Sequence, residues 1–219
     1  MAILEYPHWE AISPIMRELL VWIGRQAFSK HFYLGGGAAL ALQVGHRKSV
    51  DLDFFSETDE VHARTRQTLI HGFSPRQAQV IENVDGNLLL LVDDLHAGFF
   101  SYGYPLLEPV ETVENINIAS LLDIGLMKLD AVIGRGSRKD FFDLYIITRQ
   151  IPLPDLLRGG ERKYPQVRDF PLMALEGLLQ FDTADRDLQP EMLEDLSWEN
   201  VRKFFVEHGK MLGADWFNK

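Results

Sequence analysis

An α+β fold is predicted for this 219-residue chain, with an α/β first half and a mostly helical second half. Short apolar runs that end at glycine or aspartate turns indicate strands up to about residue 102. From residue 120 onward, apolar residues recur at helical spacing instead. Hydrophobic residues make up 46% of the chain, enough to bury a core. We place the boundary near residue 118, between an α/β core over 1–118 and a helical lobe over 119–219.

In the first half, helix and strand patterns alternate along the chain. Apolar spacing predicts a helix within residues 11–28, and His31–Leu34 predicts a strand that ends at three glycines. Asp85–Gly86 and Asp93–Asp94 are turn signals between successive strands. The further elements expected here are a helix at 37–44, a strand at 50–55, a helix at 64–71, and strands at 80–83, 87–93 and 96–102.

In the second half, the patterns are those of helices. Ser120 followed by Asp123 resembles a capping box, which predicts a helix over the LLDIGLMKLDAVIG run. A second helix is expected over 139–150, because Pro152 would interrupt it. Further helical patterns lie at 172–180, 190–196 and 198–212.

Composition excludes several classes of protein. The chain has no cysteine, which excludes disulfide scaffolds, cysteine-ligated zinc, thiol nucleophiles and iron–sulfur clusters. Its net charge of −10 argues against a general polyanion binder. The longest aliphatic run, Leu88–Val92, is far shorter than the ~20 residues of a membrane span. With no basic, apolar leader at the N-terminus, we expect a cytoplasmic protein without a membrane partner.

The charges are unevenly distributed. Residues 19–50 contain four basic residues and no acid, and residues 61–81 contain three basic residues and no acid. These two stretches flank the acidic segment 51–60. A basic rim around an acidic centre suits a phosphate-bearing ligand with a metal, although simple solvated faces would give the same pattern.

The Asp-x-Asp pattern in SVDLDFFS is the sharpest chemical feature. On a strand, Asp51 and Asp53 point to one face, roughly 6–7 Å apart, while Leu52 and Phe54 point to the other. Two such carboxylates can bind one divalent cation or two neighbouring ones, with Mg²⁺ or Mn²⁺ favoured by oxygen ligands. The structural alternative is a half-exposed strand whose polar face is acidic.

Three glycines precede this strand, at a predicted strand-to-helix junction. Glycines let the backbone approach a ligand closely, and the helix that follows offers free N–H groups to phosphates. The pattern is not a nucleotide P-loop, since no Gly-Lys-Ser/Thr follows, and Leu40 replaces the third glycine of a dinucleotide fingerprint. A glycine turn followed by an Asp-x-Asp strand would place phosphates beside a metal, which is the arrangement that phosphoryl or nucleotidyl transfer requires.

The run LGGGAALALQVGHRKSVDLDFFS resembles the first motif of the AbiEii/AbiGii-type toxin family. FFSYGYPLLEP, IASLLDIGLMKLDAVIGRGSRKDFFDLY and ERKYP follow in the order and spacing of that family, so the resemblance spans about residues 30–165. It implies a DNA polymerase β-like minimal nucleotidyltransferase core, a mixed sheet with flanking helices, followed by a helical C-terminal lobe that completes the cleft.

The resemblance also implies roles for individual residues. Asp51 and Asp53 correspond to the metal carboxylates, and Lys128 to a motif lysine that contacts the phosphates; these three are the implied catalytic residues. His46 can line the cleft or contact a phosphate, or it can be a hydrogen-bonded structural residue. The implied nucleotide-binding set is Gly36, Gly37, Ala38, Arg47, Ser49, Lys128, Lys139, Asp140 and Asp143. The alternative for Lys128 is an ordinary exposed lysine on a helix. The alternative for Lys139, Asp140 and Asp143 is a structural ion-pair network, in which Lys139 pairs with Asp143 on one helix.

Two positions depart from the family pattern. Ala38 stands where the family usually has a serine or threonine that could bind a phosphate oxygen. Gly98 stands where polymerase β-like enzymes place a third carboxylate, and Asp93 and Asp94 are expected in a turn instead. Loss of one general base typically slows catalysis by about 10²–10⁴.

We therefore expect a Mg²⁺- or Mn²⁺-dependent nucleotidyltransferase that moves a nucleoside monophosphate from an NTP to an acceptor hydroxyl. By the resemblance, the acceptor would be tRNA or a protein. The setting would be a type IV toxin–antitoxin or phage-defence pair, with a cognate antitoxin as partner. Two alternatives are a catalytically degenerate nucleotide-binding module and a scaffold that engages another protein.

Overall fold

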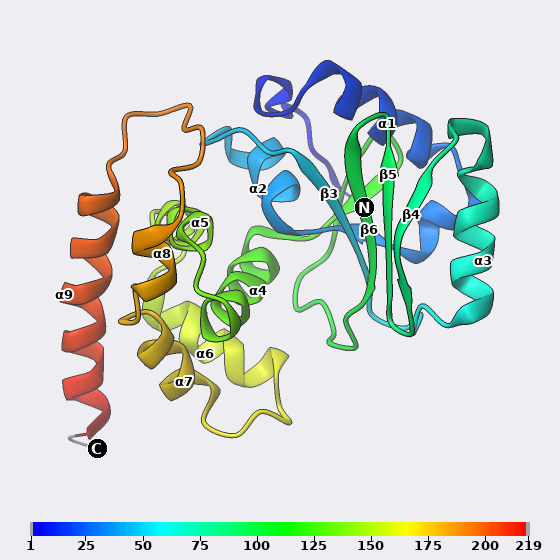
Figure 1. Ribbon diagram of the computed structural model, residues 1–219. Helices are drawn as coiled ribbons and strands as arrows, with labels where there is room; N and C mark the ends of the chain where they lie inside the picture. Colours follow the sequence, from blue (N-terminus) through cyan, green and yellow to red (C-terminus); the bar gives the residue numbers. More distant parts are fainter. Residues whose placement is uncertain (1, 218–219) are drawn as a thin grey trace. The chain divides into compact units, whose positions relative to one another are not determined.

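The computed structural model describes residues 2–217 in two compact units. The first unit extends to Ser120 and the second begins at Leu121. Figure 1 shows a sheet with helices in the first unit and helices in the second, so the predicted α+β class is confirmed.

A mixed sheet forms the first unit. Among the described residues it has eight strands in the order β1-β7-β8-β2-β3-β6-β5-β4. At its centre, β3 runs antiparallel to β2 and parallel to β6, which brings three distant segments side by side. The strands are β1 Ala2–Ile3, β2 Tyr33–Leu34, β3 Asp51–Ser56, β4 Gln79–Val84, β5 Asn87–Val92, β6 Leu95–Ser101, β7 Glu111–Val113 and β8 Ile116–Ile118.

The helix expected within residues 11–28 is shorter in the structure. Helix α1, Pro14–Gly24, begins after Ser13, whose Oγ accepts a hydrogen bond from the Met16 N–H, and proline occupies its first position. A separate 3₁₀ turn covers Ala27–His31. The other α-helices of this unit are α2 Gly36–Val44 and α3 Ala63–Gly72.

The second unit is helical. Helix α6 was not predicted, because the Gly159–Gly160 pair inside it looks like a turn; both glycines lie against neighbouring helices, at Leu126 and Phe170. The helix expected at 190–196 is absent from this described segment, which contains Pro190. The α-helices are α4 Leu121–Gly134, α5 Arg138–Thr148, α6 Leu153–Lys163, α7 Phe170–Gly177, α8 Asp182–Arg186 and α9 Trp198–Phe217.

Strand β3 has two different faces, as its alternation predicts. Leu52 and Phe54 are buried, and Phe54 stacks on Phe99 of β6 in an aromatic core. Asp51 and Asp53 lie on the other face and are half-buried. Val50 was expected in the strand but precedes it and is 68% exposed.

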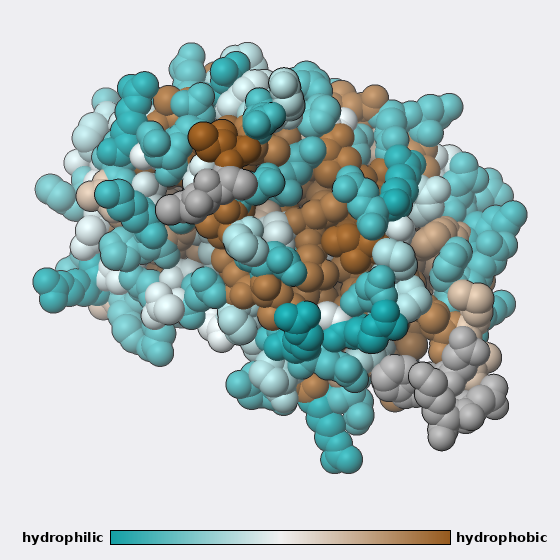
Figure 2. Space-filling view, turned by 180° about the vertical axis from the view of Figure 1, so that it is seen from behind, coloured by the Kyte–Doolittle hydropathy of each residue, from teal (hydrophilic) through white to brown (hydrophobic). Residues whose placement is uncertain are grey.

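One face of the molecule carries both kinds of surface. Figure 2 shows on this face wide hydrophilic areas and gathered hydrophobic side chains. On the edge strand β4 every residue is exposed, including Val80, Ile81 and Val84. Within residues 2–217, none of the helices has the length and apolar character needed to cross a membrane.

A substitution of Leu52 tests whether successive side chains of β3 point to opposite faces of the sheet, because the Leu52 side chain is fully buried. Leu52→Ala should lower the free energy of unfolding by about 2–5 kcal/mol, since it leaves a cavity in the core. Val50→Ala, the neighbouring exposed control, should change it by less than about 0.5 kcal/mol. Urea unfolding measures both; equal losses would contradict the assigned faces.

Candidate active site

The start of α2 lies directly against Asp53. The backbone N–H of Gly35 donates to the carbonyl oxygen of Asp53 at 2.9 Å, in line with the β2–β3 pairing. Gly36 has φ +60°, and a methyl group added to it would lie 3.0 Å from Oδ2 of Asp53. Glycine is therefore required at 36 for its conformation and for space, and the carboxylate lies beside a helix N-terminus.

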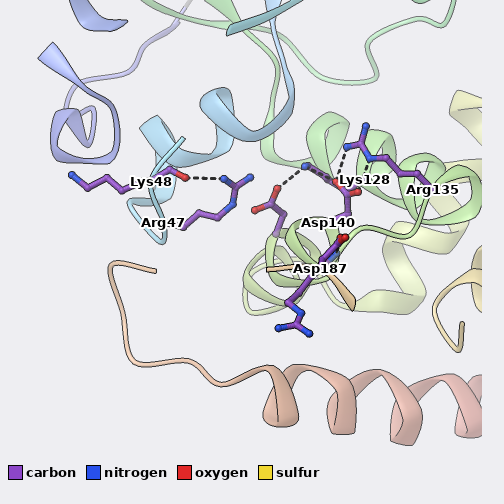
Figure 3. Close-up of polar contacts among 8 residues, drawn as sticks. Arg47, Lys48, Lys128, Arg135, Asp140 and Asp187 are labelled. Atoms are coloured by element: carbon purple, nitrogen blue, oxygen red, sulfur yellow. Dashed lines mark hydrogen bonds and ion pairs between the residues drawn. The ribbon is translucent and has the colours of Figure 1, made fainter. Parts of the chain in front are cut away.

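Arg47 and Ser49 lie at the same helix start. A methyl group added to Gly37 would lie 2.5 Å from Nη2 of Arg47 and 3.4 Å from Oγ of Ser49. The Arg47 side chain also donates from Nη1 to the backbone oxygen of Lys48 at 2.8 Å, a contact drawn in Figure 3. A guanidinium, a hydroxyl and free backbone N–H groups thus come together, which are the donors that phosphate oxygens bind.

Ala38, where the family usually has a hydroxyl, is buried in α2. Ser49 reaches the same helix start from the segment before β3, and its own N–H donates to the carbonyl of Ala11 at 2.9 Å. Ser49 therefore supplies near Gly37 the kind of group that Ala38 lacks.

Asp51 has a partner on the neighbouring strand. β3 and β6 run parallel, with Asp51 opposite His96 and Asp53 opposite Gly98. The His96 Nδ1 lies 3.3 Å from Oδ1 of Asp51, and the two side chains are 51% and 37% exposed. Across residues 2–217, no group of three or more His, Asp or Glu side chains is arranged to hold a metal ion. The two aspartates of β3 lie on this face with His96 beside Asp51.

Gly98 lies where a third carboxylate was sought, opposite Asp53. A Cβ at this position would collide with the ring of Phe100 and would lie 3.4 Å from Oδ1 of Asp53. Phe100 therefore excludes any side chain at 98 unless its ring moves. Asp93 and Asp94 form the β5–β6 turn with φ of +52° and +62°, as their sequence predicts.

The basic residues flanking the acidic segment are partly engaged elsewhere. Arg66 is buried and donates to Asn83 at 2.6 Å and to Asp85 at 2.7 Å. Arg76 pairs with Asp93 at 2.5 Å. These two arginines serve the α3–β4–β5 region, whereas Arg47 lies at the glycine turn. His46 is buried, at 2% exposure.

In the second unit, the remaining motif residues form a buried ion cluster. The Lys128 ammonium on α4 lies 2.9 Å from Asp140 and 2.5 Å from Asp143, both on α5 and both inaccessible to solvent. Arg135 donates to both oxygens of Asp140, as Figure 3 shows. The cation that contacts Asp143 here is thus Lys128, from another helix, while Lys139 is exposed.

The positive charges of this cluster stabilise the ionised form of Asp140. Burial raises the pKa of Asp140, but the positive charge of Lys128 and the hydrogen bond and charge of Arg135 outweigh it and hold the pKa below its ordinary value. Asp140 is therefore ionised at neutral pH, and the cluster joins α4 to α5.

A second buried pair was not predicted. Lys163 of α6 donates to Oδ1 of Asp123 of α4 at 2.8 Å, and neither side chain is accessible to solvent. The sequence signals were Asp123 in the capping-box pattern and Lys163 in ERKYP, but nothing in the sequence pairs residues forty positions apart.

Comparison with known proteins relates the chain to nucleotidyltransferases. Residues 18–85 match the family model described as nucleotidyl transferase AbiEii toxin, type IV TA system. An uncharacterized protein of Aquifex aeolicus, aq_aa25, is 33% identical over 195 residues, which cover 86% of this chain and 91% of that protein.

One solved structure supports the fold. The crystal structure of ANT(2″)-Ia with adenylyl-2″-tobramycin is 14% identical, covers 69% of this chain and 98% of its own, and gives a TM-score of 0.54. This match confirms the expected nucleotidyltransferase fold. JHP933 from Helicobacter pylori is 17% identical, covers 91% and 94%, and has a TM-score of 0.45.

A substitution at Gly37 tests whether the Arg47 guanidinium binds an NTP. Gly37→Ala should displace the guanidinium, because the new methyl group would lie 2.5 Å from it, and should weaken NTP binding about 10-fold through loss of a charge-assisted hydrogen bond. Calorimetric titration with each ribonucleoside triphosphate measures this. Gly134→Ala, with open space around the added methyl group, is the control. Unchanged affinity in Gly37→Ala would contradict the assignment.

Asp140 gives the second unit a pH dependence. Folding lowers the pKa of Asp140. The stability that Asp140 contributes to the folded protein is therefore complete above its ordinary pKa of about 4, and it is lost as the pH falls from there towards the lowered pKa. Asp140→Asn should cost about 3–5 kcal/mol at pH 7, since it leaves buried charge uncompensated. Urea unfolding between pH 7 and pH 2.5 should show the wild-type and variant curves converging in acid. A constant difference would contradict the lowered pKa.

Proposed function

Because the chain belongs to the AbiEii-type nucleotidyltransferase family, we propose that it moves a nucleoside monophosphate from an NTP to an acceptor hydroxyl with the help of a divalent cation. The observation that carries the proposal is the contact between the two halves of the candidate site. Oδ2 of Asp53 lies 3.0 Å from the Cβ position of Gly36, so a metal carboxylate adjoins a helix N-terminus.

The residues at the carboxylate face fit Mg²⁺ or Mn²⁺. Asp51 and Asp53 offer hard oxygen donors on one face of β3, and both remain half-buried rather than enclosed. Magnesium is typically held by one or two carboxylates and completes its shell with water and substrate phosphates, so a protein donor set of two suffices. When bound, the cation would neutralise the negative charge that builds up on the phosphates during transfer.

The glycine turn would bind the triphosphate. The N–H groups at the start of α2 donate to phosphate oxygens, and the helix dipole favours negative charge there. Arg47 adds a guanidinium and Ser49 a hydroxyl beside Gly37. Held in this way, the triphosphate would present its α-phosphorus to the acceptor hydroxyl. A phosphorus–oxygen bond forms to the acceptor, the bond to pyrophosphate breaks so that pyrophosphate leaves, and the hydroxyl proton passes to solvent water.

Lys128, Asp140 and Asp143 act in this proposal by stabilising the helical unit. Their charges are directed at one another, since Lys128 contacts both aspartates and is almost fully buried. Loss of any of them would affect activity through the fold of α4 and α5.

For the acceptor, we propose tRNA or a protein, and for the biological role a toxin opposed by a cognate antitoxin. The matching family, a toxin of a type IV TA system, supports the second point. The ANT(2″)-Ia structure holds adenylyl-2″-tobramycin, an adenylylated small molecule, so this fold is compatible with nucleotidyl transfer to a small-molecule acceptor as well.

One observation favours a second candidate function, a nucleotide-binding module without transfer activity. Gly98 removes the third carboxylate, and Phe100 occupies its space. The two candidates share metal-dependent NTP binding and differ only in whether label reaches an acceptor.

Transfer of label decides between them. We expect purified protein with α-labelled NTPs, Mg²⁺ or Mn²⁺, and bulk tRNA or cell lysate to label a macromolecule. Asp51→Ala should reduce labelling at least 100-fold while leaving the unfolding midpoint unchanged, because it removes a repelling charge from a half-exposed position.

Glu82→Ala, an exposed carboxylate on β4, is the matched control and should label normally. Full activity of Asp51→Ala would exclude the metal pair. Metal-dependent NTP binding without labelling would favour the binding module.

A further inference from the structure

We propose that His96 is a positioning residue that holds the Asp51 carboxylate in the orientation needed to bind the divalent cation. The inference rests on the proposed function, since it takes Asp51 and Asp53 as the metal carboxylates. It adds a residue of β6 to a site otherwise formed by α2, β3 and the segment between them.

Strand register places His96 next to Asp51. The two residues are partners across the parallel β3–β6 pair, so their side chains leave the sheet on the same face. Nδ1 of His96 lies 3.3 Å from Oδ1 of Asp51. The imidazole nitrogen therefore lies beside Oδ1 of Asp51, and Oδ2 is the oxygen that we take to be left for a cation.

Asp51 needs such support more than Asp53 does. Asp51 is the first residue of β3, and its side chain is 37% exposed. Asp53 lies in the middle of the strand, between the start of α2 and the Gly98 position. An exposed carboxylate at a strand end loses rotamer freedom when it binds a metal, and a fixed polar neighbour reduces that cost.

β6 offers one other position on this face close to the aspartates, and it is blocked. At Gly98 any side chain would collide with Phe100. His96, two residues earlier, is a position on this strand whose polar side chain lies beside Asp51. Residues that orient metal ligands from outside the coordination shell commonly contribute about 10- to 100-fold to metal affinity.

The test measures Mn²⁺ affinity by electron paramagnetic resonance, with Mn²⁺ alone as the probe. His96→Ala should weaken binding about 10- to 100-fold. His96→Asn should stay within about threefold of wild type, because the asparagine amide nitrogen occupies the place of Nδ1. His96→Gln, whose amide reaches the place of Nε2 instead, should behave like His96→Ala.

His31→Gln, a substitution of an exposed histidine, is the control and should bind Mn²⁺ as tightly as wild type does. Thermal unfolding should be the same for all variants, since His96 is half-exposed.

Three outcomes would overturn the inference. His96→Ala could bind Mn²⁺ as tightly as wild type, or His96→Asn could lose as much affinity as His96→Ala. A directly coordinated nitrogen in the pulsed spectrum of the Mn²⁺-loaded wild type would make His96 a ligand instead. If wild type binds no Mn²⁺, or if Asp51→Asn binds it fully, the proposed metal site itself fails; normal wild-type binding with an unaffected His96→Ala overturns this inference alone.

Discussion

The candidate site depends on one close approach, between the backbone of Gly36 and the side chain of Asp53. The hydrogen bond from Gly35 to the Asp53 carbonyl fixes the distance between β2 and β3. Gly36 then turns the chain into α2 with a positive φ, and its missing Cβ leaves room for Oδ2. A larger residue at 36 would be strained at this positive φ, and its Cβ would press on Oδ2 of Asp53.

Charge is used differently in the two units. In the first, Asp53 and Arg47 lie at the start of α2, where the helix dipole favours an anionic ligand. In the second, Lys128 and Lys163 are buried against aspartates of other helices. A buried ion pair contributes little net stability, but losing one partner is costly. These pairs link α4 to α5 and α4 to α6.

Much of this arrangement was accessible from sequence, because it depends on local periodicity. Strand alternation separated Asp51 and Asp53 from Leu52 and Phe54, and the turn signals located the hairpins around β5. Long-range pairings left no such pattern: the register that sets His96 against Asp51, the ring of Phe100 over Gly98, and the Asp123–Lys163 pair. The proposed metal role of Asp51 and Asp53 stays a prediction, and so does that of Gly36 and Gly37 in phosphate binding.

A crystal structure of the protein with Mn²⁺ and a non-hydrolysable NTP analogue is the most direct test of the shared site. Our account predicts an anomalous manganese peak bound by oxygens of Asp51 and Asp53, with triphosphate oxygens accepting hydrogen bonds from the N–H groups at the start of α2 and from Arg47. Manganese bound elsewhere, or a triphosphate that does not contact the α2 N-terminus, would contradict it.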